Sequence, residues 1–306
     1  MSHFSCIVFC ENPSELETKL APFHEFECTG LDDQYVEDFD ITEQAMNTYK
    51  SQIQNYDSFN IFLNEWYGYD CVEFGEEPYL GDKHKYGYYT IDEDENVIKV
   101  IDRTNKNKKW DWYALGGRWH NYFLPLENAK SSIVGKPSWG HKKDGIHDHW
   151  VDGLQIKDLD FTQMKSIALD SAEKLYDRLE KILAGRTLPC FESIKSKHEN
   201  LDDARKEYWD HPVIKDLNND EDFRWWLFGN DNLNLTREEY YKQTLESIVT
   251  PYAFVDLDGN WHEKGEMGWF CVSINEKEYT SWSDQFWNYV KSVPDTTYML
   301  MIDCHC

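Results

Sequence analysis

Aromatic and charged side chains crowd into residues 110–120, which read Trp-Asp-Trp-Tyr-Ala-Leu-Gly-Gly-Arg-Trp-His. Trp, Tyr and Arg dominate binding hot spots, and an Arg among aromatic rings can stack on them or grip a carboxylate. The candidates for binding a partner are therefore Trp110, Trp112, Tyr113, Arg118 and Trp119. The same stretch also fits an aromatic core around a Gly–Gly turn with one Asp–Arg pair. It lacks the glycine spacing of a phosphate-binding loop.

Histidines and aspartates gather in a second stretch, residues 141–152. His and Asp are ligands for divalent metals, and two histidines at i, i+2 suit one ion only in an extended segment. The candidate ligands are His141, His147, His149 and Asp152. The alternative is a solvated polar loop, and on that interpretation the chain holds no metal and no other cofactor.

A third stretch, residues 262–269, places two glutamates near His262. Such carboxylates and a histidine could form an acid–base pair. The HExxH pattern of zinc proteases is absent because Glu266 stands where the second His is required, and GxSxG is absent from the chain. A charged hairpin explains the stretch equally, so we assign no catalytic residue.

The net charge restricts the partners. Among 306 residues, 57 are acidic and 31 basic, which gives a net charge of −26 and disfavours direct binding to nucleic acid. Residues 1–100 carry −17, residues 101–200 carry +3 and the rest carry −12. The acidic candidates for docking a basic protein are Asp32, Asp33, Glu37 and Asp38, which repel one another unless a cation faces them. Their alternative role is to keep the surface solvated.

No apolar run is long enough to cross a bilayer, and the first residues lack the basic flank and cleavage site of a secretion signal. We therefore expect a soluble, cytosolic protein without membrane contact. Hydrophobic residues make up 41 % of the chain, which is enough for a core and excludes wholesale disorder.

The eight cysteines have no CxxC spacing, so we expect buried free thiols rather than a zinc ribbon or a disulfide framework. On a terminal strand, Cys304 and Cys306 share one face and His305 takes the other, which argues against one ion bound by all three. The shared face makes Cys304 and Cys306 candidates for contact with a second subunit.

Element signals predict an α+β fold whose mixed or antiparallel sheet unites the two ends of the chain. Strands are expected at 3–9, 86–91, 97–101, 252–256, 261–263, 269–274 and 298–303, and helices at 13–20, 42–68, 164–182, 236–249 and from 281. Residues 192–227 should be helical in part, and 127–155 should form a long loop. The domain prediction is a core of 1–126 and 250–306, with 127–249 inserted.

Four landmarks occur in order along the chain: Met1-Ser2-His3-Phe4, the 110–119 cluster, Gly265-Glu266-Met267-Gly268-Trp269 and Asp303-Cys304-His305. Together they resemble a widespread family of bacteriophage and prophage proteins, from whose usual apolar end Cys306 departs. One similarity that this suggests is to phage inhibitors of the Gabija defence complex. Those inhibitors assemble as oligomers around a nuclease–helicase complex and block its access to DNA. No functional residue is carried over from them.

The resemblance and the charge lead to one expectation. The chain is a phage anti-defence protein and not an enzyme. It forms homo-oligomers in the host cytoplasm and blocks a host complex with a basic DNA-binding surface. One alternative is a metal-dependent hydrolase of a nucleotide or signalling molecule, based on the second and third stretches. The other is a small-ligand sponge whose pocket is formed by Arg118 and the tryptophans.

Overall fold

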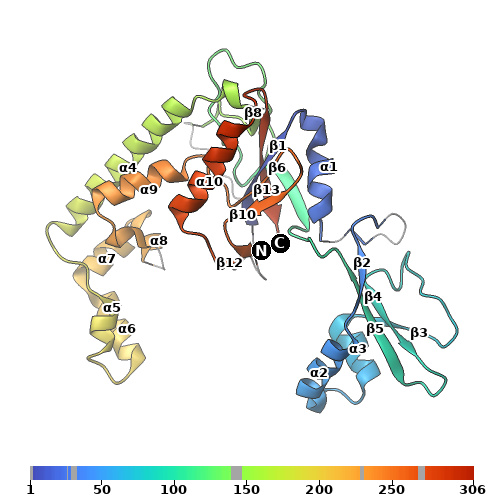
Figure 1. Ribbon diagram of the computed structural model, residues 1–306. Helices are drawn as coiled ribbons and strands as arrows, with labels where there is room; N and C mark the ends of the chain where they lie inside the picture. The colour runs from blue at the N-terminus through green and yellow to red at the C-terminus, as the bar shows by residue number, and fades with distance from the viewer. Residues whose placement is uncertain (1–2, 26, 29–32, 139–146, 228–230, 268–272) are drawn as a thin grey trace.

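The computed structural model describes residues 3–25, 27–28, 33–138, 147–227, 231–267 and 273–306. It has three parts: a central sheet, a helical arm from α4 to α9, and a smaller β lobe of residues 37–104 (Figure 1). The arm and the β lobe extend from opposite sides of the central sheet. In the described residues, none of the helices has both the length and the apolar character needed to cross a membrane.

The central sheet joins the first and last strands of the chain. Its order is β10-β9-β1-β13-β6-β7, and β8 also pairs with β13. β1 and β13 run antiparallel over eight residue pairs, from His3 opposite His305 to Cys10 opposite Tyr298. The bounds are β1 His3–Cys10, β6 Trp112–Gly117, β7 Lys136–Pro137, β8 Gly153–Gln155, β9 Ala253–Val255, β10 Trp261–Glu263 and β13 Tyr298–His305. The α+β fold with a shared terminal sheet is confirmed.

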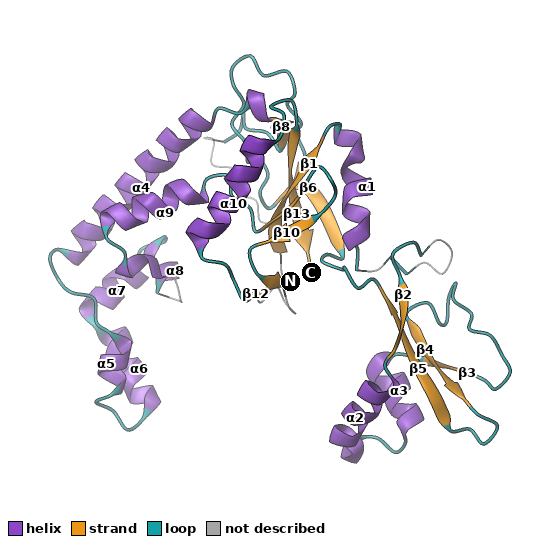
Figure 2. Ribbon diagram, viewed as in Figure 1, coloured by secondary structure: helices purple, strands orange, loops and turns teal. Residues whose placement is uncertain are grey.

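Both faces of the central sheet are covered, which explains the nearly continuous apolar sequence of β1. Ile7 and Phe9 enter a core beneath helix α10 (Tyr279–Ser292), while Cys6 and Val8 enter a second core beneath α1 (Leu16–Leu20). Figure 2 shows these two helices on opposite sides of the sheet. The helical segment predicted from residue 13 starts with a capping box between Asn12 and Glu15, which opens the short 3-10 turn Pro13–Glu15 before α1.

The β lobe has its own sheet and its own core. The strand order is β2-β5-β4-β3, with bounds Glu37–Asp40, Val97–Thr104, Gly87–Ile91 and Asp70–Val72 in that order. Helices α2 (Thr42–Gln52) and α3 (Phe59–Tyr67) contribute to a core that includes Ala45, Phe62, Leu63 and Val100. The predicted 86–101 hairpin is confirmed as β4 and β5. Residues 37–104 thus form a separate unit, although they lie within the segment 1–126 that was expected to belong to the central core.

The single helix expected over 42–68 is two helices. Ser58 is extended and its hydroxyl caps α3 by accepting the amide of Ile61, so the chain restarts a helix there. Gly68, at φ 71°, ends α3 in the left-handed conformation, as the predicted end required. The apolar periodicity continued across the break because both helices face the same core.

The helical arm is built on α4 (Phe161–Leu183), the amphipathic helix that the sequence predicted. Its other helices are α5 Phe191–Lys195, α6 Leu201–Asp210, α7 Pro212–Asn218, α8 Phe223–Trp226 and α9 Arg237–Ser247. Leu179 packs with Val213, Leu217 and Phe223 in the core of the arm. The insertion is shorter than the expected 127–249, because β7 and β8 lie within that range and belong to the central sheet.

Two further two-residue strands, β11 (Glu266–Met267) and β12 (Ser273–Ile274), pair antiparallel. They support the charged-hairpin interpretation of the third stretch. The expected strand at 269–274 falls mostly outside the described residues.

Candidate functional site

A tight turn at Gly116-Gly117 lies directly on two buried carboxylates. Asp152 and Asp303 are both 0 % exposed. The glycines have φ of 79° and 54°, and a Cβ on Gly117 would come within 2.3 Å of Asp303 side-chain atoms. A Cβ on Gly116 would lie 2.7 Å from the Asp152 carboxyl carbon. Both positions therefore require glycine for backbone conformation and for close approach.

Asp152 joins the first two stretches that the sequence singled out. Its carboxylate accepts hydrogen bonds from the amides of Asn121 and Gly135, each at 2.7 Å, and lies 2.8 Å from Nδ1 of His120. Because the aspartate accepts from Nδ1–H, it fixes the orientation of the His120 ring. Such a pair could act as an acid–base group.

The His120–Asp152 pair borders a surface pocket of about 400 Å³, whose lining residues are His120, Asn121, Val134, Asp148, His149, Trp150 and Val151. Trp150 is 7 % exposed, and its indole nitrogen has no hydrogen-bond partner among the described residues. The pocket combines residues from the Trp-rich stretch and from the His/Asp-rich stretch, which the sequence alone did not place together.

Asp303 makes a second set of contacts at the same turn. It lies 2.7 Å from Nδ1 of His3 and accepts the amide of Arg118 at 2.8 Å. The neighbouring His305 places its Nδ1 2.6 Å from Asp111 and stacks on Trp112. Since the His3 side chain is only 5 % exposed, this cluster ties strands together more readily than it could meet a substrate.

The aromatic partner-binding candidates divide into buried and exposed residues. Trp110 is 6 % exposed and stacks on His24, so it belongs to the core. Tyr113 and Trp119 are half-buried against the two cores. Trp112, 41 % exposed, and the exposed Arg118 remain at the surface. The expected Asp–Arg pair is absent from this turn, because Asp111 binds His305 instead.

The acidic docking candidates are mostly neutralised within the chain. Arg103, 7 % exposed, makes ion pairs with Asp33 at 3.0 Å and with Asp38 at 2.9 Å. Burial acts to lower the pKa of Arg103, but these two carboxylates outweigh it and raise the pKa. Glu37 pairs with Lys106 at 2.6 Å, and Asp32 lies outside the described residues. The chain thus supplies cations for Asp33, Glu37 and Asp38, while the side chains of Glu37 and Asp38 stay about half exposed.

The possible metal ligands are not assembled around one position. His141 lies outside the described residues, and the His147 ring packs edge-on against Trp150. The oxygens of Asp152 accept the amides of Asn121 and Gly135 and meet Nδ1 of His120. Within the described ranges, no three His, Cys, Asp or Glu side chains are placed to hold one ion.

The two terminal cysteines do not offer free thiols to a second subunit. Cys304 is 0 % exposed, and burial followed by its hydrogen bond with Cys6 raises its pKa. Cys306 is disulfide-bonded, so the expectation of free thiols throughout is wrong at that position. Neither residue is therefore placed as the oligomer contact that the shared strand face suggested.

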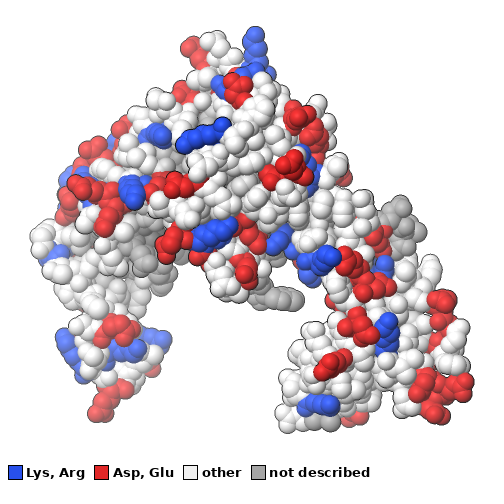
Figure 3. All heavy atoms as spheres, viewed as in Figure 1, with Lys and Arg blue, Asp and Glu red and all other residues white. Residues whose placement is uncertain are grey.

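A surface that the sequence did not single out lies on the β lobe. Among the lobe residues whose exposure is described, six large apolar side chains are exposed: Ile61, Trp66, Phe74, Tyr79, Tyr86 and Ile98. It has 16 acidic and 5 basic residues, and Figure 3 shows red side chains spread over it with few blue ones. The available signal was the alternation of aromatic and acidic residues in 73–79, Glu-Phe-Gly-Glu-Glu-Pro-Tyr, which follows neither helix nor strand periodicity.

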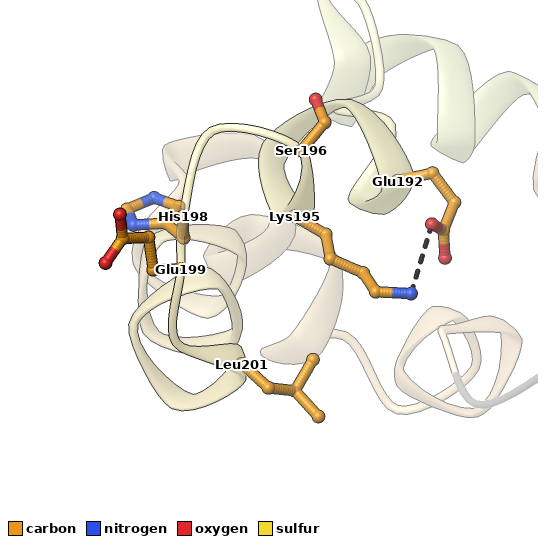
Figure 4. A pocket seen from close by; sticks show the side chains of 6 residues that line it. All are labelled: Glu192, Lys195, Ser196, His198, Glu199 and Leu201. Carbon is orange, nitrogen blue, oxygen red and sulfur yellow. Dashed lines mark hydrogen bonds and ion pairs between the residues drawn. The ribbon is translucent and has the colours of Figure 1, made fainter.

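A further pocket of about 310 Å³ lies on the helical arm (Figure 4). Lys195 reaches Glu192 at 3.3 Å, while His198 pairs with Glu207 at 2.6 Å. The labelled side chains point in different directions and do not converge on one position. The pocket therefore carries no assembled chemistry.

Comparison with known proteins adds no relative: the chain matches no family model, no curated protein and no solved structure.

Proposed function

We propose that this chain is a non-catalytic binding protein, phage-encoded, that uses the β lobe to occupy a basic DNA-binding surface on a host defence complex of the Gabija type. The observation that carries the proposal is the combination, on one lobe, of exposed acidic and exposed aromatic side chains. A basic surface attracts the acidic side chains, and the aliphatic stems and rings of its own side chains can pack against the aromatic ones. Occupying that surface would exclude DNA from the complex.

The charge that remains after internal pairing supports this role. The β lobe keeps a net charge of −11 even with Arg103 and Lys99 included. The exposed Glu76, Glu77 and Glu93 have no ion-pair partner in the part of the chain that is described. Carboxylates left unpaired at the surface retain their field and steer a basic partner toward the lobe, with an effect that weakens as salt rises.

The arrangement of the His–Asp pairs also favours binding over catalysis. Asp152 accepts the backbone amides of Asn121 and Gly135, and Asp303 accepts that of Arg118. Each carboxylate also meets an imidazole, His120 for Asp152 and His3 for Asp303. Removing either carboxylate would leave those amides without an acceptor, so both carboxylates have a structural role.

The test is competition for DNA. The purified chain is added to the host complex bound to fluorescent duplex DNA, and displacement is followed by anisotropy. Wild type should displace the DNA, and the lobe variant Glu76→Lys/Glu77→Lys/Glu93→Lys should require at least about ten-fold more protein, since each close charge pair contributes 1 kcal/mol or more.

The matched control is Glu199→Lys/Asp203→Lys/Glu221→Lys on the helical arm, which changes net charge equally at exposed positions. If both triple variants lose displacement equally, bulk charge and not the lobe is responsible. If wild type displaces no DNA from any defence complex tested, the proposed function is wrong.

A second candidate function is small-ligand binding beside the Gly–Gly turn. It is favoured by two exposed side chains of this region: Trp112, which stacks on His305 with ring centroids 5.2 Å apart and is 41 % exposed, and Arg118. Aromatic rings and guanidinium groups are side chains that suit the base and the phosphates of a nucleotide. Titration of a nucleotide panel against tryptophan fluorescence, with Trp112→Phe as the control, should show quenching in wild type only.

A further inference from the structure

The loop between β3 and β4 is fixed by one buried histidine. His84 is 5 % exposed. Its Nδ1 accepts the amide of Tyr79 at 2.8 Å, and its Nε2 lies 3.2 Å from the carbonyl of Cys71. The amide of His84 also donates to the carbonyl of Tyr79 at 3.0 Å. Because Nδ1 accepts from an amide, the proton of the neutral ring is on Nε2, which donates to Cys71.

The same loop exposes two aromatic side chains to solvent. Phe74 is 59 % and Tyr79 is 65 % exposed. If the loop were mobile, it would lose conformational entropy when a partner bound its rings, and this loss would weaken the affinity. Because His84 already holds the loop in the folded protein, that entropy is lost on folding and not on binding.

Carboxylates surround the two rings in sequence. Glu73, Glu76 and Glu77 are exposed and have no ion-pair partner within the described residues. The amide of Glu76 donates to the carbonyl of Glu73 at 3.0 Å, which turns the backbone between them. The loop has two cations, Lys83 beside Asp82, and Lys85, whose Nζ lies over the ring of Tyr86.

We infer that the loop of residues 73–83 is a docking element for arginine side chains on the surface of a basic partner. A guanidinium stacks on an aromatic ring and donates two parallel hydrogen bonds to a carboxylate, whereas a lysine ammonium is a compact, strongly hydrated charge. Exposed rings among unpaired glutamates therefore select arginine over lysine at equal charge. The inference rests on the proposed function and names the partner chemistry at that same lobe.

The experiment measures that selectivity directly with the full chain. Fluorescein-labelled nona-arginine and nona-lysine peptides are titrated by anisotropy at physiological ionic strength. Wild type should bind the arginine peptide about two- to five-fold more tightly, as expected for one exposed cation–π contact. The variant Phe74→Ala/Tyr79→Ala should bind the two peptides equally. Its affinity for the lysine peptide, which is the weaker and salt-sensitive one in wild type, should stay unchanged.

The control variant Trp66→Ala/Ile98→Ala removes two other exposed apolar side chains of the same lobe and should keep the selectivity. His84→Leu, which removes the clamp, should reduce selectivity while the circular dichroism spectrum stays that of wild type. Equal binding of both peptides to wild type, or undiminished selectivity in Phe74→Ala/Tyr79→Ala, would overturn the inference.

The two proposals fail separately. Displacement of DNA from the host complex without arginine selectivity would leave the proposed function standing and remove the loop from it. Arginine selectivity without displacement would keep the docking element and reject the host complex as its target.

Discussion

Asp303 connects three places that are far apart in the chain. It belongs to β13, it meets His3 of β1, and it accepts the amide of Arg118 at the end of β6. A buried carboxylate with these partners is stable only while the turn keeps its close approach. The glycine at 117 is what permits that approach.

Gly117→Ala should therefore be strongly destabilising. The new Cβ would lie 2.3 Å from Asp303 side-chain atoms, and the residue would keep a positive φ. We expect a loss of about 3 kcal/mol or more in the free energy of unfolding, measured by urea denaturation. Gly185→Ala is the control, because Gly185 has φ 76° but open space around it, and it should cost about 1 kcal/mol. Equal losses would mean that backbone conformation, not the contact with Asp303, sets the requirement.

Thiol reactivity should follow burial. Cys190 is exposed, whereas Cys6, Cys10 and Cys304 are fully buried. Burial raises the pKa of the Cys10 thiol to about 12, so almost none is thiolate near neutral pH. Iodoacetamide applied to the native protein should modify Cys190 and spare the other three, as read by peptide mass spectrometry. Comparable native labelling of Cys10 would contradict the burial, and Cys190→Ser should remove the main labelled peptide.

For single residues, the sequence indicated which local feature they form better than which distant residues they contact. The Gly–Gly turn within an aromatic core was one of the two interpretations of residues 110–120. The carboxylates beneath the turn could not be found, because Asp152 and Asp303 lie 36 and 186 residues from the glycines they approach. Likewise the acidic run gave no sign that Arg103 would fold back onto Asp33 and Asp38.

The helix α9 shows how local chemistry specifies an element. Thr236 and Glu239 cap each other at its start, with the Glu239 carboxylate accepting the Thr236 amide at 2.8 Å. The backbone and hydroxyl hydrogen bonds from Thr236 lower the pKa of Glu239. The sequence predicted this start because the capping box lies within four residues.

Thr236→Ala should lower the free energy of unfolding by about 1 kcal/mol through loss of the hydroxyl cap. A carboxyl with a lowered folded pKa stabilises the fold above its unfolded pKa, and this contribution disappears as the pH falls through the folded pKa. The difference between variant and wild type should therefore shrink on acidification. The matched control is Thr244→Ala within the same helix, which should change stability by less than about 0.5 kcal/mol. A difference that stays constant down to acid pH would exclude the capping box as its cause.

Elements defined by long-range contacts were less predictable. The break between α2 and α3 was missed since both segments show apolar periodicity toward one core, and only the Ser58 cap divides them. The two-residue strand β7 gave no periodic signal at all. It exists because its residues pair with Gly116 and Gly117 of β6.

The whole molecule carries a charge that opposes its compactness. Pairing of Arg103 and Lys106 neutralises only part of the acidic surface, and the net charge remains −26. The uneven distribution of this charge can be counted along the sequence, but nothing in the sequence indicated that residues 37–104 form a separate lobe.

Salt should therefore stabilise the fold. Raising sodium chloride from about 10 mM to about 150 mM shortens the screening length from about 30 Å to about 8 Å. This weakens repulsion between distant carboxylates more than it weakens the close ion pairs, so the melting temperature should rise. Differential scanning calorimetry measures it, and choline chloride at equal ionic strength is the control for specific sodium binding. A melting temperature that falls with salt would show that the ion pairs outweigh the repulsion.

The neighbours of β1 in the central sheet are β9 and β13, and both come more than 240 residues later in the chain. Ribosomes add about 5 to 20 residues per second, so an emerging β1 waits roughly 12 to 50 s for its first partner strand. During that time an apolar strand with two unpaired edges is open to other chains. The β lobe, whose strands all lie within residues 37–104, can close in the meantime. The negative charge of the folded lobe would then repel the lobes of neighbouring nascent chains and keep these chains apart until the central sheet is complete.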